Sequence, residues 1–197
     1  MVTLVLISGS LRRGSVNSAL IRAAQRVAAR HPEVTASSIL PLHDFPPYDE
    51  DAEAVGAPLT IVRARRQVSE ADGLLMATPE YNGAMSGVLK NAVDWLSRPW
   101  RSSPLTAKPV VTLSAAPGAG GGIKGQITLR PVLAELGADV VPHDLVAVPG
   151  APDLLDADGE LGSDAVLAQL EMLVDTLVAR CVEIRSPVGA RAAAHSP

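Results

Sequence analysis

The residues best suited to chemistry begin in a short loop near the N-terminus, between an apolar run at 2–8 and a helical pattern that starts at Asn17. The loop supplies hydroxyls, an amide and two adjacent guanidinium groups, at Ser10, Arg12, Arg13, Ser15 and Asn17. Free N–H groups and the positive end of a helix dipole favour an anion there, and arginine adds charge-assisted hydrogen bonds. The pattern therefore predicts a phosphate site. The alternative is that Ser15 or Asn17 only caps the helix and that the arginines are solvated.

A second loop follows an apolar run at 73–78 and places a tyrosine beside an Asn-Gly pair. Its residues are Pro79, Glu80, Tyr81, Asn82 and Gly83. Asn-Gly suits positive φ angles, and small residues let the backbone approach the edge of a flat heteroaromatic ligand while a tyrosine covers a face or rim. The loop predicts either the border of a planar-ligand site or a tight turn with Tyr81 packed as a lid. Glu80 either tunes the edge of the bound ring or caps the Asn82-Gly83 turn, and we favour the role at the backbone.

A third loop, at 114–122, has four glycines in nine residues, so its backbone N–H groups are unshielded. Ser114 and Gly118 are the residues in it that we expect at a ligand edge. The alternative is a flexible connection. None of the three loops carries the GxGxxG pattern of a dinucleotide fingerprint, and the chain has no Gly-Lys-Ser/Thr, so a Rossmann or P-loop assignment is poorly supported.

The elements that must position these loops alternate between strand and helix. Apolar runs predict strands at 2–8, 33–40, 73–78, 109–115 and 139–148, and helical spacing predicts helices at 17–30, 60–71, 85–96, 123–136 and 164–183. Parallel neighbours need crossover helices, so we expect an α/β fold with a doubly wound parallel sheet covered on both faces. Ligands of such sheets bind at the carboxyl ends of the strands, where all three loops start.

The remaining segments are expected to be irregular. Residues 41–58 hold four prolines and five acidic residues, which predicts a long surface loop. We expect one domain at 1–185 and a disordered tail at 186–197.

Composition excludes several classes of protein. Lys and Arg number 17 against 21 Asp and Glu, a net charge of −4, so a basic nucleic-acid or membrane-surface binder is not the default interpretation. The single cysteine, Cys181, excludes an intramolecular disulfide, and no Cys/His cluster has zinc-site spacing. No stretch approaches the roughly 18 apolar residues of a membrane span, so we expect a cytoplasmic protein without metal, membrane or nucleic-acid partner.

Side-chain catalysis is not expected either. The four histidines, which we expect to be solvated or structural, are His31, His43, His143 and His195. They lie in or beside turns and the tail and form no catalytic constellation with serine and aspartate. The residues alone therefore offer no candidate for a side-chain catalyst.

Taken together, the three loops resemble the NADPH-dependent FMN reductase family, a flavodoxin-like group that includes quinone, azo-dye and chromate reductases. The first match is Gly9-Ser10-Leu11-Arg12 with Ser15 and Asn17, positions that hold the FMN phosphate in relatives. The second is 79–83 running into 89–99, whose first five residues border the isoalloxazine ring in relatives. The third is the glycine-rich loop ahead of Leu129-Arg130, although relatives more often have serine at the position of Ala116.

The resemblance implies a five-stranded flavodoxin-like sheet of order 2-1-3-4-5 with FMN at its switch point. It implies NADPH or NADH as co-substrate, a two-step reduction of quinones, free flavin or similar small acceptors, and no catalytic side chain. It also implies a homodimer or homotetramer to which Met85 to Trp100 contribute. Trp95 and Trp100 are then expected in the core or an interface, and Tyr48 beside the active site.

The alternative functions are a flavodoxin-type electron carrier and a non-catalytic FMN-binding protein. The chain has one Phe, two Tyr and two Trp. Carriers generally shield the flavin ring between two aromatic side chains, whereas the three loops offer only Tyr81. An open ring face leaves room for a nicotinamide and then an acceptor, which favours the reductase.

Overall fold

The computed structural model describes residues 1–186 and shows a six-stranded parallel sheet. Its strands are β1 (Val2–Ser8), β2 (Val34–Leu40), β3 (Gly73–Ala77), β6 (Pro109–Ala115), β7 (Asp139–Val140) and β8 (Val146–Val148). Their order is β2-β1-β3-β6-β7, and β8 also pairs with β6. The predicted order 2-1-3-4-5 is confirmed for its first four positions, and β7 and β8 share the fifth.

The prediction of one continuous strand at 139–148 is wrong. Pro142 lacks an N–H group for the ladder, and the ring of His143 takes the place of a backbone acceptor. The Thr112 N–H of β6 donates to His143 Nε2 at 3.3 Å, while His143 Nδ1 lies 2.7 Å from the Asp144 carbonyl. Strand pairing with β6 resumes only at Val146.

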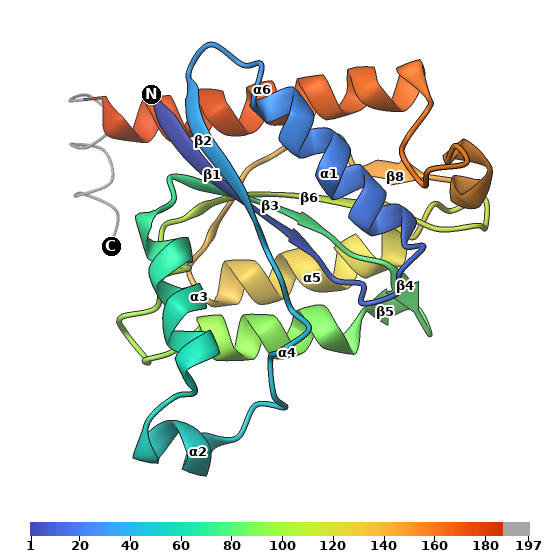
Figure 1. Ribbon diagram of the computed structural model, residues 1–197. Helices are drawn as coiled ribbons and strands as arrows, with labels where there is room; N and C mark the ends of the chain where they lie inside the picture. The colour runs from blue at the N-terminus through green and yellow to red at the C-terminus, as the bar shows by residue number, and fades with distance from the viewer. Residues whose placement is uncertain (187–197) are drawn as a thin grey trace.

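Helices cover both faces of the sheet, as the sequence predicts (Figure 1). One face carries α1 (Val16–Ala28) and α6 (Asp164–Arg185), and the other carries α3 (Leu59–Glu70), α4 (Gly87–Leu96) and α5 (Ile123–Glu135). Strand side chains alternate between the two layers. Leu4 and Leu6 pack with α1 and α6, while Val5 and Ile7 pack with the residues of α3, α4 and α5.

The segment expected to be a loop at 41–58 contains a short helix, α2 (Glu50–Val55). Its first N–H groups are capped by Asp49, whose carboxylate accepts from the Asp51 N–H at 2.9 Å. Since α2 has no buried residue, hydrophobic periodicity could not reveal it. Helix α2 projects from the end of the molecule where α3 lies (Figure 1).

This segment is fastened to α3 and α4 by paired polar groups. The Arg65 Nη2 of α3 lies 2.8 Å from Glu53 Oε1, and the indole N–H of the fully buried Trp95 donates to the Pro46 carbonyl at 2.8 Å. The Tyr48 ring meets Trp95 edge-on with the ring centroids 4.9 Å apart. Trp95 is therefore a core residue, as expected, and Tyr48 is its partner.

Smaller elements complete the chain. A hairpin joins β4 (Glu80–Tyr81) to β5 (Ala84–Met85), and a 3-10 helix, η1 (Ala151–Leu154), follows β8. No helix within residues 1–186 is long and apolar enough to cross a membrane. Of the tail expected at 186–197, positions 187–197 lie outside the described residues.

Cys181 is a buried residue of α6, as the sequence predicts for a small hydrophobic side chain. Burial raises the pKa of its thiol to about 12. The thiol faces the Asp72 carbonyl at 3.3 Å. It is therefore a structural group and not a reactive one.

Candidate functional site

The first and second loops meet directly at the carboxyl end of β1. The Ser86 hydroxyl, which caps α4, donates to the Gly9 carbonyl at 2.6 Å. A Cβ on Gly9 would lie 2.8 Å from Ser86 Oγ and 2.9 Å from Leu89 Cβ. Only glycine fits this contact, so Gly9 sets how closely the first loop approaches α4.

The first and third loops are joined by Asn17. Its amide donates to the Ala115 carbonyl at 2.9 Å and accepts from the Ala115 N–H at 3.0 Å, and its side chain is buried. Asn17 was predicted to contact a phosphate; in the fold, one N–H and the oxygen of its amide hold the end of β6. The second Nδ2 hydrogen and the backbone N–H of Asn17, in the first turn of α1, make no hydrogen bond among the described residues.

The second and third loops are joined at the start of α5. Glu80 Oε2 accepts from the Lys124 N–H at 3.1 Å, so this carboxylate sits at the positive end of the α5 dipole. A Cβ on Gly125 would lie 2.9 Å from the Pro79 carbonyl. The three predicted loops therefore form one continuous rim at the carboxyl ends of β1, β3 and β6.

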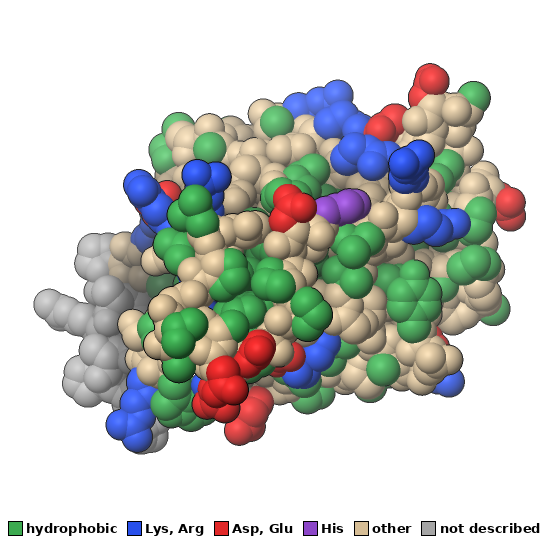
Figure 2. All heavy atoms as spheres, turned by 60° about the horizontal axis from the view of Figure 1, so that its bottom comes forward, with side chains coloured by type: hydrophobic (Ala, Val, Ile, Leu, Met, Phe, Trp, Pro, Cys, Tyr) green, Lys and Arg blue, Asp and Glu red, His purple; other side chains and the backbone are tan. Residues whose placement is uncertain are grey.

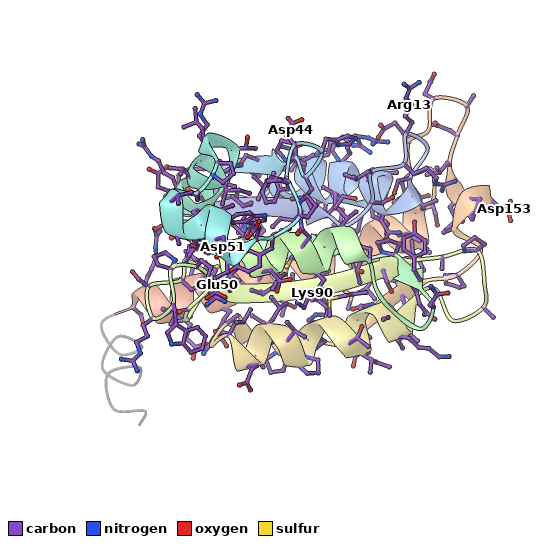
Figure 3. The ribbon with its side chains drawn as sticks, turned by 90° about the horizontal axis from the view of Figure 1, so that it is seen from below. Arg13, Asp44, Glu50, Asp51, Lys90 and Asp153 are labelled. Carbon is purple, nitrogen blue, oxygen red and sulfur yellow. The ribbon has the colours of Figure 1, made fainter. Side chains whose placement is uncertain are left out.

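Unused hydrogen-bond donors gather in the first loop. Ser15 is the N-cap of α1 and accepts from the Ser18 N–H at 3.2 Å, which confirms the capping alternative for that residue. Among the described residues, the guanidinium groups of Arg12 and Arg13 have no hydrogen-bond or ion-pair partner, and both side chains are exposed. Figure 3 shows Arg13 projecting outward from this end of the molecule. The loop thus combines two free cations with the positive end of a helix.

The second loop is a tight hairpin turn with an exposed tyrosine. Asn82 has φ of 52° and Gly83 has φ of 76°, the positive values that a two-residue turn requires. Tyr81 is 55% exposed, so it is not packed as a lid. The Met85 N–H donates to Thr128 Oγ1 at 2.8 Å, which holds the hairpin against α5.

The third loop rests on a buried polar network. The Ser114 hydroxyl donates to the Gly121 carbonyl at 2.9 Å and accepts from Gln126 Nε2 at 2.9 Å. Gln126 also accepts from the Thr112 hydroxyl at 3.0 Å and donates to the Val146 carbonyl at 2.9 Å. Ser114 and Gln126 are both fully buried. Ser114, predicted as a ligand contact, thus supports the loop from beneath.

The structural role of Gln126 was not predicted from the sequence, although its position in the helix pattern indicates one. Gln126 occupies the first position of an i, i+3, i+7 series with Leu129 and Leu133, which otherwise is apolar. A polar residue in such a series needs buried partners. Gly118, by contrast, lies in open space, with no atom within 4 Å of the position of its Cβ.

Within residues 1–186, no group of three or more His, Cys, Asp or Glu side chains is arranged to hold a metal ion. The arrangement offers cations and backbone N–H groups to a phosphate, and an exposed tyrosine beside glycine-rich backbone to a flat ring. The unpaired arginines and the open backbone at Gly118 fit a flavin mononucleotide.

Comparison with known proteins gives one consistent family. The model of the NADPH-dependent FMN reductase family matches residues 2–153. An NAD(P)H-dependent FMN reductase of Pseudomonas aeruginosa is 39% identical over 87% of this chain and 90% of the relative. A quinone reductase of Escherichia coli K12 is 41% identical over 70% of this chain and 72% of the relative.

A solved structure agrees with these sequence relatives. The flavoenzyme NAD(P)H:(acceptor) oxidoreductase FerB of Paracoccus denitrificans superposes with a TM-score of 0.81 and 27% identity, covering 92% of this chain and 98% of that one. The family match includes all three loops of the rim and the strands that carry them. The chain belongs to the NADPH-dependent FMN reductase family.

Proposed function

We propose that this protein binds FMN at the rim and uses NADPH or NADH to reduce quinones, free flavin or similar small acceptors. The observation that carries the proposal is the pair of unpartnered guanidinium groups, Arg12 and Arg13, at the N-terminus of α1. A surface that leaves two neighbouring cations unpaired beside free backbone N–H groups is suited to a dianionic phosphate. The family match supports the same cofactor.

The phosphate is held by the first loop. Arg12 and Arg13 supply the charge, and the backbone N–H groups of Val16 and Asn17 point along the α1 axis before the first intrahelical hydrogen bonds. Ser10 adds a hydroxyl that already accepts from the Arg12 N–H at 3.4 Å. Ser15 and the Asn17 amide act indirectly, because they fix the loop to α1 and β6.

The flavin ring is bordered by the second and third loops. Pro79 to Gly83 present backbone at one edge with Tyr81 at the rim, and Gly118 leaves the other edge open. Bound FMN supplies the chemistry, which is acceptance of hydride from the nicotinamide and its delivery to the acceptor. Backbone N–H groups of these loops stabilise negative charge at the ring edge, while Glu80 and Ser114 keep the loops in place.

An exposed ring face separates this proposal from an electron carrier. Among the described residues of the three loops, Tyr81 is the sole aromatic side chain, and it is 55% exposed. A nicotinamide and then a quinone have room above a ring that is not covered on both faces. The relatives named quinone reductase support this assignment of the acceptor class.

Assembly and location extend the proposal. We place the enzyme in the cytoplasm, where NADPH and NADH are supplied, and as a homodimer or homotetramer. An apolar surface on α2, α3 and the turn after α4 supports self-association: Val55 is 90%, Leu59 63% and Trp100 66% exposed. Figure 2 shows apolar side chains interspersed with acidic ones on this part of the surface.

The test is turnover by the purified protein after loading with FMN and removal of free flavin. Oxidation of NADPH and NADH is followed by absorbance with and without benzoquinone. We expect oxidation that requires both the bound flavin and the quinone. A protein that retains FMN yet oxidises neither nicotinamide is a carrier or scaffold, and the reductase assignment then fails.

A further inference from the structure

A basic cavity lies at the opposite end of the sheet from the flavin rim. It has a volume of about 500 Å³ and is formed by α3, the residues after α4 and the segment 99–106 that enters β6. Four of its ten lining residues are arginines and four carry hydroxyls. Among the residues that the structure describes, no carboxylate lines it. The arginines are Arg65, Arg66, Arg98 and Arg101.

The positive charge of this cavity exceeds that of the acids that pair with its arginines. Arg65 and Arg98 share one carboxylate, Glu53, at 2.8 Å and 3.9 Å. Arg66 pairs with Glu70 at 2.7 Å on the surface. Among the described residues, Arg101 has no ion-pair partner. Four guanidinium groups thus face two carboxylates, which leaves an excess of two positive charges.

Two of the arginines are held in place with donors to spare. Arg65 uses Nε on the Trp95 carbonyl at 2.9 Å and Nη2 on Glu53, and its guanidinium lies 5.8 Å from the Trp95 ring centroid. Arg98 uses Nε on the Tyr48 hydroxyl at 3.0 Å. In the part of the chain that the structure describes, Nη1 of Arg65 and both terminal nitrogens of Arg98 make no hydrogen bond. Guanidinium groups that are already held in place lose little conformational freedom when they bind an oxyanion.

Arg101 is the third arginine of the cavity, and its backbone conformation is strained. Its φ of 68° lies in the left-handed region, which is unfavourable for a non-glycine residue. Ser102 and Thr106 line the cavity beside it. Planar guanidinium donors combined with hydroxyls match the tetrahedral oxygens of a phosphate.

This cavity is distinct from the flavin site. The flavin loops follow the carboxyl ends of β1, β3 and β6, whereas the segment 99–106 precedes the amino end of β6. Seven residues of strand separate the two ends, which corresponds to roughly 20 Å. Figure 1 shows α3 on the side of the molecule opposite the β4–β5 hairpin.

We propose that this cavity is a second anion site that binds a phosphate or diphosphate group, carried by inorganic diphosphate or by a nucleotide. Arg98 and Arg101 donate to the oxyanion, and Arg65 supplies charge from the inner wall. The proposal depends on this cluster alone and not on the flavin chemistry.

The test is calorimetric titration of the protein as purified with inorganic diphosphate in phosphate-free buffer. We expect one saturable site that Arg101→Ala weakens by about tenfold, the effect of one charge-assisted hydrogen bond. Arg30→Ala is the matched control, because Arg30 is also an exposed arginine that pairs with no acid among the described residues. It leaves the affinity unchanged.

Two further titrations distinguish the alternatives. Arg13→Ala tests whether diphosphate binds at the flavin loop instead, and the proposal is overturned if this variant loses affinity while Arg101→Ala does not. The absence of saturable binding to the wild type also overturns it. Adenosine diphosphate is titrated in parallel, and binding through Arg101 that is tighter than that of inorganic diphosphate identifies a nucleotide as the source.

Discussion

Two segments that follow neighbouring strands, residues 9–15 after β1 and 41–58 after β2, use their polar side chains in opposite ways. In the second segment, the Tyr48 ring packs on Trp95 of α4, Glu53 pairs with Arg65 of α3, and the Pro46 carbonyl accepts from Trp95. In the first segment, Arg12 and Arg13 have none within residues 1–186. Figure 3 places Arg13 at one end of the molecule and Glu50 and Asp51 of α2 at the other.

The contrast distinguishes a segment that binds a ligand from a segment that stabilises the fold. A segment whose aromatic ring and carboxylate pair with neighbouring helices, as Tyr48 and Glu53 do, stabilises the fold. A loop that keeps cations unpaired at a helix N-terminus gains its hydrogen bonds only when an anion arrives. Residues 9–15 are therefore the binding loop, and residues 41–58 are a brace across α3 and α4.

The largest effect is expected from removing the anchor of the brace. Trp95→Ala leaves a cavity beside Tyr48 and removes one of the two hydrogen bonds to the Pro46 carbonyl, which should cost about 3–5 kcal/mol of unfolding free energy. The measurement is urea unfolding, with Tyr81→Ala as the control because that ring is exposed. Equal losses of unfolding free energy in the two variants would contradict the assignment of residues 41–58 as a brace.

A smaller effect is expected from the network beneath the third loop. Gln126→Leu leaves Thr112, Ser114 and the Val146 carbonyl without their buried partner, at a cost of about 1–3 kcal/mol. Ser114, which holds the Gly121 carbonyl, loses its hydrogen bond from Gln126, so FMN affinity should fall together with stability. Stability loss with unchanged FMN affinity would show that the third loop does not position the flavin.

The smallest expected effect is on the pH dependence of stability, and it comes from His143, which lies between β7 and β8. Burial lowers the pKa of His143, and Arg130 lowers it further against the opposing influence of the Asp144 carbonyl. The unfolded chain then binds this proton more readily, so stability is present above about pH 6.5 and decreases as the pH falls toward the folded-state pKa. His143→Asn should reduce this slope of urea midpoint against pH. An unchanged slope would remove His143 as its source.

Much of the fold was predictable because it depends on local patterns. Apolar runs identified β1, β3 and β6, which are buried on both faces, and helical spacing identified α1, α4 and α6. The break after Val140 was not predictable, since it depends on a contact between His143 and Thr112, 31 positions apart. Helix α2 escaped notice because a cap at Asp49 and the pairing of Glu53 with Arg65 hold it, without a buried face.

The candidate site was predictable at the level of loops but not of side-chain roles. Glycines, hydroxyls and arginines after apolar runs marked all three loops of the rim. The roles of Asn17 and Ser114 depend on partners that only folding brings close, such as Ala115, 98 positions from Asn17. Residue type therefore indicated a polar site, and pairing decided which groups remain free.

The most direct test of the binding loop compares FMN with riboflavin, which lacks the phosphate. Fluorescence titration of the apoprotein should show FMN binding at least about tenfold tighter, because the phosphate gains charge-assisted hydrogen bonds. In the double variant Arg12→Ala/Arg13→Ala, whose side chains are exposed, that preference should largely disappear while stability stays unchanged. Equal affinity of the wild type for the two flavins, or a preference that survives in the double variant, would contradict the assignment of residues 9–15 as the phosphate-binding loop.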